Sequence, residues 1–212
     1  MKKIAKLNTI IVFFIILIIA MFPSFIIAAD IDWKTDTSIN LQQLDVTLLK
    51  SYERGKDVLS YYLQGMTVTN KYIIFAQTKS NTENTFITVV DKNTFEILNI
   101  INDFCFGHAN NLTYNSKEDL CYMSYYTDTE NFIARFRIDE NYQMTELQIR
   151  RVKYYFGSIA YNVDKNQFIV RKSNTIYIMD YDFNIISSFD IRTDLTKQDI
   201  VYHNNKIYHI YF

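Results

Sequence analysis

The sequence predicts an all-β protein built from repeated units of four strands. Two observations carry this prediction: a short phrase returns along the chain, and four apolar runs follow each copy. Setting Met66, Leu112, Ile159 and Ile200 in register gives steps of 46, 47 and 41 residues. Steps of this size are typical of repeat architectures, and four antiparallel strands per step are the blade of a β-propeller.

Composition agrees with this fold class. The 212 residues suffice for one domain with a substantial core. Tyr (17) and Phe (16) are abundant, which favours pleated, half-buried strands. With only 4 Gly and 1 Pro, turns must be made by Asn, Asp, Lys and Ser. The net charge of -1, with both signs mixed along the chain, excludes the basic field that nucleic-acid binding requires.

The clearest copy of the phrase is Phe106-Gly107-His108-Ala109-Asn110-Asn111-Leu112-Thr113-Tyr114. In each copy a small or polar pair precedes a large apolar residue, a small or β-branched residue, and then an aromatic residue or Val. The other copies begin at Gln64, Gly157 and Gln198. The phrase therefore marks the first strand of each blade.

The N-terminal segment predicts export. Three lysines within the first six residues precede an apolar run of about 13 residues, Ile10–Phe22, and small residues end the segment at Ala29. We expect residues 1–29 to be a signal peptide, cut after Ala28 or Ala29, or an uncleaved membrane anchor, since about 20 apolar residues span a bilayer. Either places the remainder outside the cytoplasm, secreted or on the outer face of the cytoplasmic membrane.

The domain plan follows from these boundaries. Residues 30–60 are expected to form a linker that contains a closing strand at 44–49. The propeller is expected over 61–212, with blades at 61–106, 107–155 and 156–197 and a partial blade at 198–212. The strands expected in these blades are 65–69, 72–77, 86–91, 95–101; 109–114, 120–126, 132–138, 143–149; 157–162, 167–172, 175–180, 185–191; and 199–202, 206–211.

A second feature repeats in step with the first. Asp91, Asp139 and Asp180 each end the third strand of a blade, with spacings of 48 and 41 residues. An Asp at this point can accept backbone N–H bonds from residues two positions on and so begin a turn.

The blade count leaves three interpretations open. Propellers use about four to eight blades, and this sequence offers three complete blades and a partial fourth. Residues 44–49 could supply the outermost strand of the last blade, which would still lack its third. A homodimer could complete it. We favour a third interpretation, in which the chain is the front part of a longer propeller.

Six residues are predicted to bind a ligand at one mouth of the central channel. They are Gln64, His108, Asn110, Asn111, Gln198 and Asp199. Convergent polar groups over an apolar wall suit a small molecule, a glycan, a peptide or a protein. The alternative is that these side chains bond the backbone of neighbouring blades, which we favour for Asn110 and Asn111.

His108 is the best single candidate, because Gly107 allows close backbone approach and His titrates nearest neutral pH. His203 and His209 lie in the fourth repeat, and no spacing typical of a metal site occurs. No nucleophile elbow, phosphate loop or dinucleotide-binding motif is present either. The sequence therefore predicts no catalytic residue, no metal and no cofactor.

Aromatic residues and cysteines each have two interpretations. Tyr122, Tyr125, Tyr126 and the stretch 154–156 could stack on sugars, but blade cores also use aromatics, and we favour the core. Cys105 and Cys121 could form a disulfide in an exported protein, but two buried thiols are favoured.

The phrases Gln64-Gly65-Met66 and 107–115 resemble those that open the blades of exported bacterial β-propellers of the glutaminyl-cyclotransferase and YVTN-repeat type. The resemblance covers residues 61–212. Members with glutaminyl cyclisation activity depend on acidic groups in the channel, and Asn111 stands where the family phrase has Asp. The resemblance implies the fold and identifies no catalytic residue here.

Three functions therefore compete. The favoured one is a non-enzymatic binding module with its ligand at the channel mouth. The second is a glutaminyl-cyclotransferase-like enzyme, which a buried acid with a raised pKa beside His108 would favour. The third is an incomplete propeller without independent function.

Overall fold

The computed structural model describes residues 29–32, 35–38, 62–78, 85–127, 129–154, 156–191 and 197–211. Within these ranges the chain is all-β, with sixteen strands in four antiparallel sheets of four strands each. The expected signal or anchor segment before Ala29 and the expected strand at 44–49 lie outside the described residues. No helix long and apolar enough to cross a bilayer occurs in the part of the chain that is described.

Three blades are continuous in sequence and follow the predicted order. The first has β3 (Tyr62–Val68), β4 (Tyr72–Thr78), β5 (Thr85–Asp91) and β6 (Ile97–Phe106). The second has β7 (His108–Asn115), β8 (Leu120–Tyr126), β9 (Asn131–Ile138) and β10 (Met144–Val152). The third has β11 (Ser158–Asn162), β12 (Gln167–Lys172), β13 (Thr175–Met179) and β14 (Ile185–Asp190). The predicted strands match these within a few residues.

The fourth blade joins the two ends of the described chain. Its inner strands are β15 (Lys197–His203) and β16 (Lys206–Tyr211), and its outer strands are β1 (Ala29–Asp32) and β2 (Thr35–Ser38). Ala29 pairs with His209 in the β1–β16 ladder. The structure thus differs from the expectation of a partial fourth blade: residues that the sequence assigned to the leader and linker supply both outer strands.

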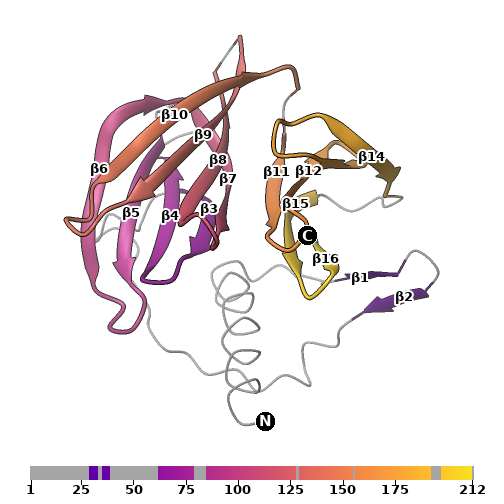
Figure 1. Cartoon of the computed structure of the whole chain (residues 1–212), viewed down its shortest axis with the longest axis horizontal. Coiled ribbons are helices and arrows are strands. Elements are labelled where there is room, and N and C mark those ends of the chain that lie inside the picture. Colours follow the sequence, from indigo (N-terminus) through magenta and orange to yellow (C-terminus); the bar gives the residue numbers. More distant parts are fainter. Residues whose placement is uncertain are drawn as a thin grey trace.

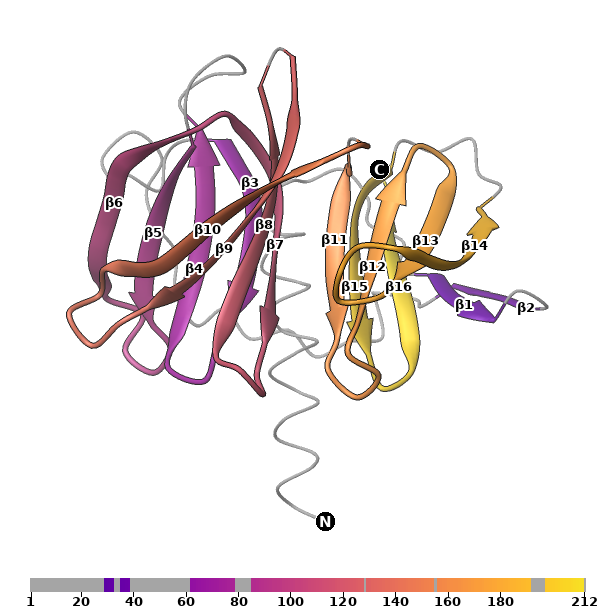
Figure 2. The same ribbon diagram turned by 45° about the horizontal axis from the view of Figure 1, so that its top comes forward.

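The blades are arranged around a common axis. Figures 1 and 2 show the first strand of each blade near the middle of the molecule and the fourth strands at the periphery. The main contacts between blades run from β3 to β7, from β7 to β11 and from β11 to β15. This order of radiating sheets is the arrangement of a β-propeller.

The hydrophobic core lies between successive blades. One cluster, which includes Phe106, Met123 and Phe136, fills the space between the first and second blades. A second cluster, with Phe168, packs between the second and third blades. Ile176 belongs to a third cluster, between the third and fourth blades. Since successive blades cover the facing sides of one another's sheets, burial between blades holds the arrangement together.

The aromatic residues for which sugar stacking was considered mostly belong to this core, as favoured above. Tyr122 and Tyr125 are 3% and 5% exposed, and Phe156 is 4% exposed. Tyr126 and Tyr154 are half-buried, and Tyr155 lies outside the described residues. Cys121 is a free, buried thiol, and burial raises its pKa. The interpretation of a buried thiol is therefore confirmed for Cys121.

The three repeated aspartates begin turns in the predicted way. Each Oδ1 accepts two backbone N–H bonds, the first of them from the residue two positions on. For Asp91 the donors are Asn93 at 2.7 Å and Thr94 at 2.8 Å. The donors to Asp139 are Asn141 and Gln143, and the donors to Asp180 are Asp182 and Asn184. These bonds lower the pKa of Asp91 and, together with the side-chain bond from Asn184, that of Asp180.

A third repeated feature lies where the first and second strands of a blade are joined, here called the turn end. There the hydroxyl of an inner-strand tyrosine donates to an Asp or Asn in the turn. The pairs are Tyr114 with Asp119 at 2.6 Å, Tyr161 with Asn166, and Tyr202 with Asn205 at 2.8 Å. These turn residues have φ near 60°, which Asn and Asp tolerate better than most residues.

Candidate functional site

The end of the propeller at which the inner strands begin, here called the mouth, has an irregular backbone. Three inner strands carry a bulge there. The register skips one residue between Leu63 and Gly65, between Ala109 and Asn111, and between Lys197 and Asp199. The skipped residues are Gln64, Asn110 and Gln198, all of them predicted site residues. A bulge bends a strand and re-aims its side chains, and bulges are common beside functional sites.

Each bulge precedes a position that is equivalent in the four repeats. The residues at this position are Gly65, Asn111, Ser158 and Asp199. In the second and fourth blades the side chain accepts the N–H of the next residue: Leu112 N donates to Asn111 Oδ1 and Ile200 N donates to Asp199 Oδ1, both at 2.6 Å. The same local geometry thus recurs with an amide in one blade and an acid in the other.

Asn111 and Asp199 meet directly. Asn111 Nδ2 donates to Asp199 Oδ1 and also to the carbonyl oxygen of Ile159 at 3.1 Å. Asn111 is 2% exposed. One amide therefore connects the second, third and fourth blades, in part as the backbone-bonding interpretation predicted for Asn111.

Asp199 carries the clearest electrostatic signal of the site. The residue is half-buried, but its carboxyl group is enclosed by protein, and this burial raises its pKa to about 7. The N–H of Ile200, the charge of Arg171 and the bond from Asn111 all act in the opposite direction. The carboxyl group can therefore gain or lose a proton near neutral pH.

Gly65 lets the first blade approach the second closely. A Cβ added there would lie 2.7 Å from Asn111 Cα and 2.8 Å from Leu112 N, both backbone atoms. The absence of a side chain at 65 therefore allows β3 to pack against β7 beside the residue that reaches Asp199.

Arg171 is the residue of this end that the sequence analysis missed. It is 8% exposed, and its Nε donates to Ser158 Oγ at 3.2 Å while Nη1 donates to Ser173 O at 3.4 Å. A Cβ at Gly157 would lie 2.8 Å from Nη2, so the guanidinium group occupies the space beside this glycine. A charge at the end of the apolar run Phe168–Val170 was the signal that could have identified it.

The predicted histidines do not gather. The ring of His108 lies 5.2 Å from that of Tyr126, on the strand paired with β7. His203 ends β15, and His209 is fully buried in β16. Among the described residues no three His, Cys, Asp or Glu side chains form a group that could hold a metal ion.

The other predicted residues lie in different surroundings. Gln64 Nε2 donates to Thr78 Oγ1 at 3.4 Å, on the neighbouring strand of its own blade. Asn110 is half-buried at its bulge, and the side chain of Gln198 lies outside the described residues. Of the six predicted residues, the structure thus joins Asn111 with Asp199 by a direct side-chain bond.

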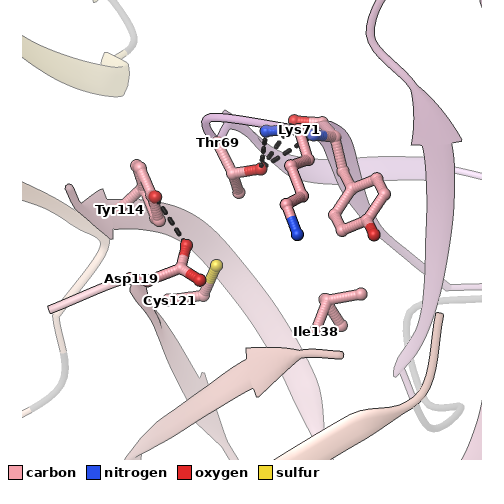
Figure 3. Close-up of a pocket in the computed structure, with 7 residues that line it drawn as sticks. Thr69, Lys71, Tyr114, Asp119, Cys121 and Ile138 are labelled. Carbon is pink, nitrogen blue, oxygen red and sulfur yellow. Dashed lines mark hydrogen bonds between the residues drawn. The ribbon is translucent and has the colours of Figure 1, made fainter. Parts of the chain in front are cut away.

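The described pocket lies at the opposite, turn end of the molecule, between the first and second blades. It encloses about 250 Å³, including space open to solvent, and is lined by Thr69, Lys71, Tyr72, Tyr114, Asp119, Cys121 and Ile138. Figure 3 shows two of its hydrogen bonds, from Tyr114 to Asp119 and from Lys71 N–H to the Thr69 hydroxyl. These hydrogen bonds hold the turns between the first and second strands. The residues that line the pocket therefore belong to the turn structure that repeats from blade to blade.

Comparison with known proteins identifies the fold alone. No protein-family model and no curated protein matches the chain. A gluconolactonase from Xanthomonas campestris is 11% identical over 82% of this chain, with a TM-score of 0.50. The β-propeller domain of Cps50 (Swd1) from Myceliophteria thermophila is 11% identical over 77%, with a TM-score of 0.45. The chain spans 64% and 58% of their lengths.

The four antiparallel sheets, together with the likeness to the gluconolactonase, establish an all-β propeller fold. The fold by itself does not determine the function, which depends on the residues at the ends of the strands.

Proposed function

We propose that the chain is an exported binding module that takes a glycan, peptide or protein ligand at the mouth of the propeller. The observation that carries the proposal is the set of bulges at Gln64, Asn110 and Gln198, followed by the joined pair Asn111 and Asp199. Amide side chains both donate and accept hydrogen bonds, which suits the hydroxyl groups of sugars and the backbone of peptides.

Export rests on the N-terminal sequence. A cut after Ala28 would leave β1 (Ala29–Asp32) whole, so a signal peptide can be removed without losing the strands of the fourth blade. N-terminal sequencing of the protein from its native host tests this: a chain beginning at Ala29 or Asp30 supports secretion. A chain that retains Met1 and remains in the membrane fraction supports the anchored form.

The binding test uses arrays of glycans and short peptides probed with the labelled full-length chain. The informative variants are Gln64→Ala and Asn110→Ala, which alter half-buried bulge residues of the mouth. Lys165→Ala, an exposed residue of the turn end, is the control. We expect the mouth variants to lose a ligand that the wild type and the control retain. Equal retention by all four proteins, or no retention by the wild type, would contradict the proposal.

Asp199 favours a second function, a glutaminyl-cyclotransferase-like enzyme. Its carboxyl group has a pKa of about 7, as suits a general acid or base at neutral pH, although its bonded neighbour is Asn111 rather than His108. It would accept a proton from the amine of an N-terminal glutamine as that amine attacks the γ-carbonyl carbon of the same residue, and it would return the proton to the amide nitrogen, which leaves as ammonia.

The enzyme is tested with peptides that begin with glutamine, by measuring ammonia release. Release by the wild type that Asp199→Asn abolishes would establish this second function. The absence of release above the uncatalysed rate would exclude it and leave the binding module.

A further inference from the structure

A cationic cluster lies on the mouth face where the second blade connects to the third. The ammonium of Lys172 lies 4.3 Å from the centre of the Tyr154 ring, and that of Lys153 lies 5.3 Å from the same centre. Lys172 is the last residue of β12, and Lys153 and Tyr154 follow β10 directly. Two ammonium groups from different blades thus lie beside one aromatic ring.

The charges of this cluster differ from those of the nearby outer strands. There Arg151, the next-to-last residue of β10, pairs with Glu130 at 2.9 Å. Neither Lys153 nor Lys172 has a carboxylate within ion-pair distance among the residues that the structure describes. Two ammonium groups at one ring therefore create a local positive potential that a ligand anion can neutralise.

Arg171 extends this positive charge toward the inner strands. It precedes Lys172 on β12, and its guanidinium group bonds Ser158 at the start of β11. Gly157, on the connection from Tyr154 to β11, leaves the space that this group occupies. Arg171 thus adds a third cation at this end of β12, on the face of the strand opposite to Lys172 and close enough to act on the Asp199 carboxyl group.

Resting on the proposed function, we propose that the ligand of the mouth is an anionic glycan whose carboxylate binds Lys153 and Lys172 beside the Tyr154 ring. The carboxylate attracts both ammonium groups away from the ring, and the C–H face of the sugar then packs on the aromatic surface. The amides of Gln64 and Asn110, at the bulges of the mouth, would bond hydroxyl groups of further sugar units. An acidic peptide would supply the charge without the stacking face.

The test uses polygalacturonate, its methyl ester and polyglutamate with the full-length chain, measured by isothermal titration calorimetry. The ester keeps the sugar rings and removes the charge, whereas polyglutamate keeps the charge and removes the sugars. We expect polygalacturonate to bind at least about tenfold more tightly than either of the others, and its binding to weaken as salt is raised.

The matched variants are Lys153→Gln/Lys172→Gln at the mouth and Lys165→Gln/Lys206→Gln at the turn end, which remove equal charge. The mouth pair should lower the affinity for polygalacturonate about tenfold, and the turn-end pair less than about twofold. Equal effects of the two pairs, or equal binding of polyglutamate, would overturn the inference. Binding of the ester that Gln64→Ala removes and Lys153→Gln/Lys172→Gln spares would overturn the inference and leave the proposed function standing.

Discussion

The two ends of the inner strands follow opposite rules. At the turn end, equivalent positions hold equivalent residues, so Tyr161 and Asn166 repeat the pairing of Tyr114 and Asp119. At the mouth, equivalent positions hold different residues, and three of the four inner strands are bulged beside them. Repetition of one bond in successive blades indicates a structural framework, whereas divergence at one position of the repeat indicates a site adapted to something other than the fold.

The largest expected effect concerns the mouth. The pKa of Asp199 rises from 3.8 to about 7 on folding, so the folded chain binds the additional proton between these values. The contribution of this proton to the free energy of unfolding is fully present below the pKa of the unfolded chain, and it is lost as the pH rises through about 7. The free energy of unfolding should therefore fall by about 3 kcal/mol between about pH 5 and pH 8 through this group.

Asp199→Asn removes the titration while keeping an oxygen for Asn111 and Ile200 to bond. Urea unfolding of this variant should show a pH dependence smaller by that amount than the wild type's. Asp164→Asn, an exposed change at the turn end, is the control and should leave the wild-type dependence. If the free energy of unfolding varies with pH in the same way for the wild type and for Asp199→Asn, burial does not raise the pKa of the Asp199 carboxyl group.

The second prediction separates two glycines of the mouth. Gly65→Ala places a Cβ against the backbone of Asn111, which cannot yield, and should lower the free energy of unfolding by about 2 kcal/mol. Gly157→Ala meets the end of the Arg171 side chain, which can move, and should cost less than about 1 kcal/mol. Urea unfolding measures both. Equal costs would mean that Arg171 is as immobile as the backbone.

The fold was largely predictable because its signals are local. The hairpin turns, and the turns that begin at Asp91 and its equivalents, depend on hydrogen bonds between residues close in sequence, and these turns recur in each repeat. They delimit the strands of three blades, which could therefore be predicted. The β1–β2 pair was missed because Ala29–Ser38 is short, polar and next to an apolar leader. Its signal was Asp32, which ends β1 as Asp91 ends β5.

The site was predictable only in part, for a related reason. Aligning the repeats identified Gln64, Asn110 and Gln198 at the mouth, and the structure explains them as bulges. The bond between Asn111 and Asp199 joins residues 88 positions apart and depends on how the blades are arranged around the axis. No local pattern encodes such an arrangement.

The third prediction concerns the framework at the turn end. Tyr161→Phe removes the hydroxyl that accepts from Asn115 Nδ2 at 3.1 Å and donates to Asn166. Asn115 is 1% exposed, so its amide loses a buried partner between two blades. The free energy of unfolding should fall by about 1.5 kcal/mol with ligand binding unchanged. A loss of binding at unchanged stability would contradict the division between the two ends.

The fourth prediction tests the weakest copy of the same bond. The Tyr202 hydroxyl bonds Asn205 and, in the third blade, the side chain of Asn162, at a half-buried position where water can replace a lost partner. Tyr202→Phe should therefore change the free energy of unfolding by no more than about 0.5 kcal/mol. Comparison with Tyr161→Phe under identical urea unfolding isolates the effect of burial, since the two variants delete the same group from the same place in the repeat. If both cost the same, burial adds nothing to what this repeated bond contributes to stability.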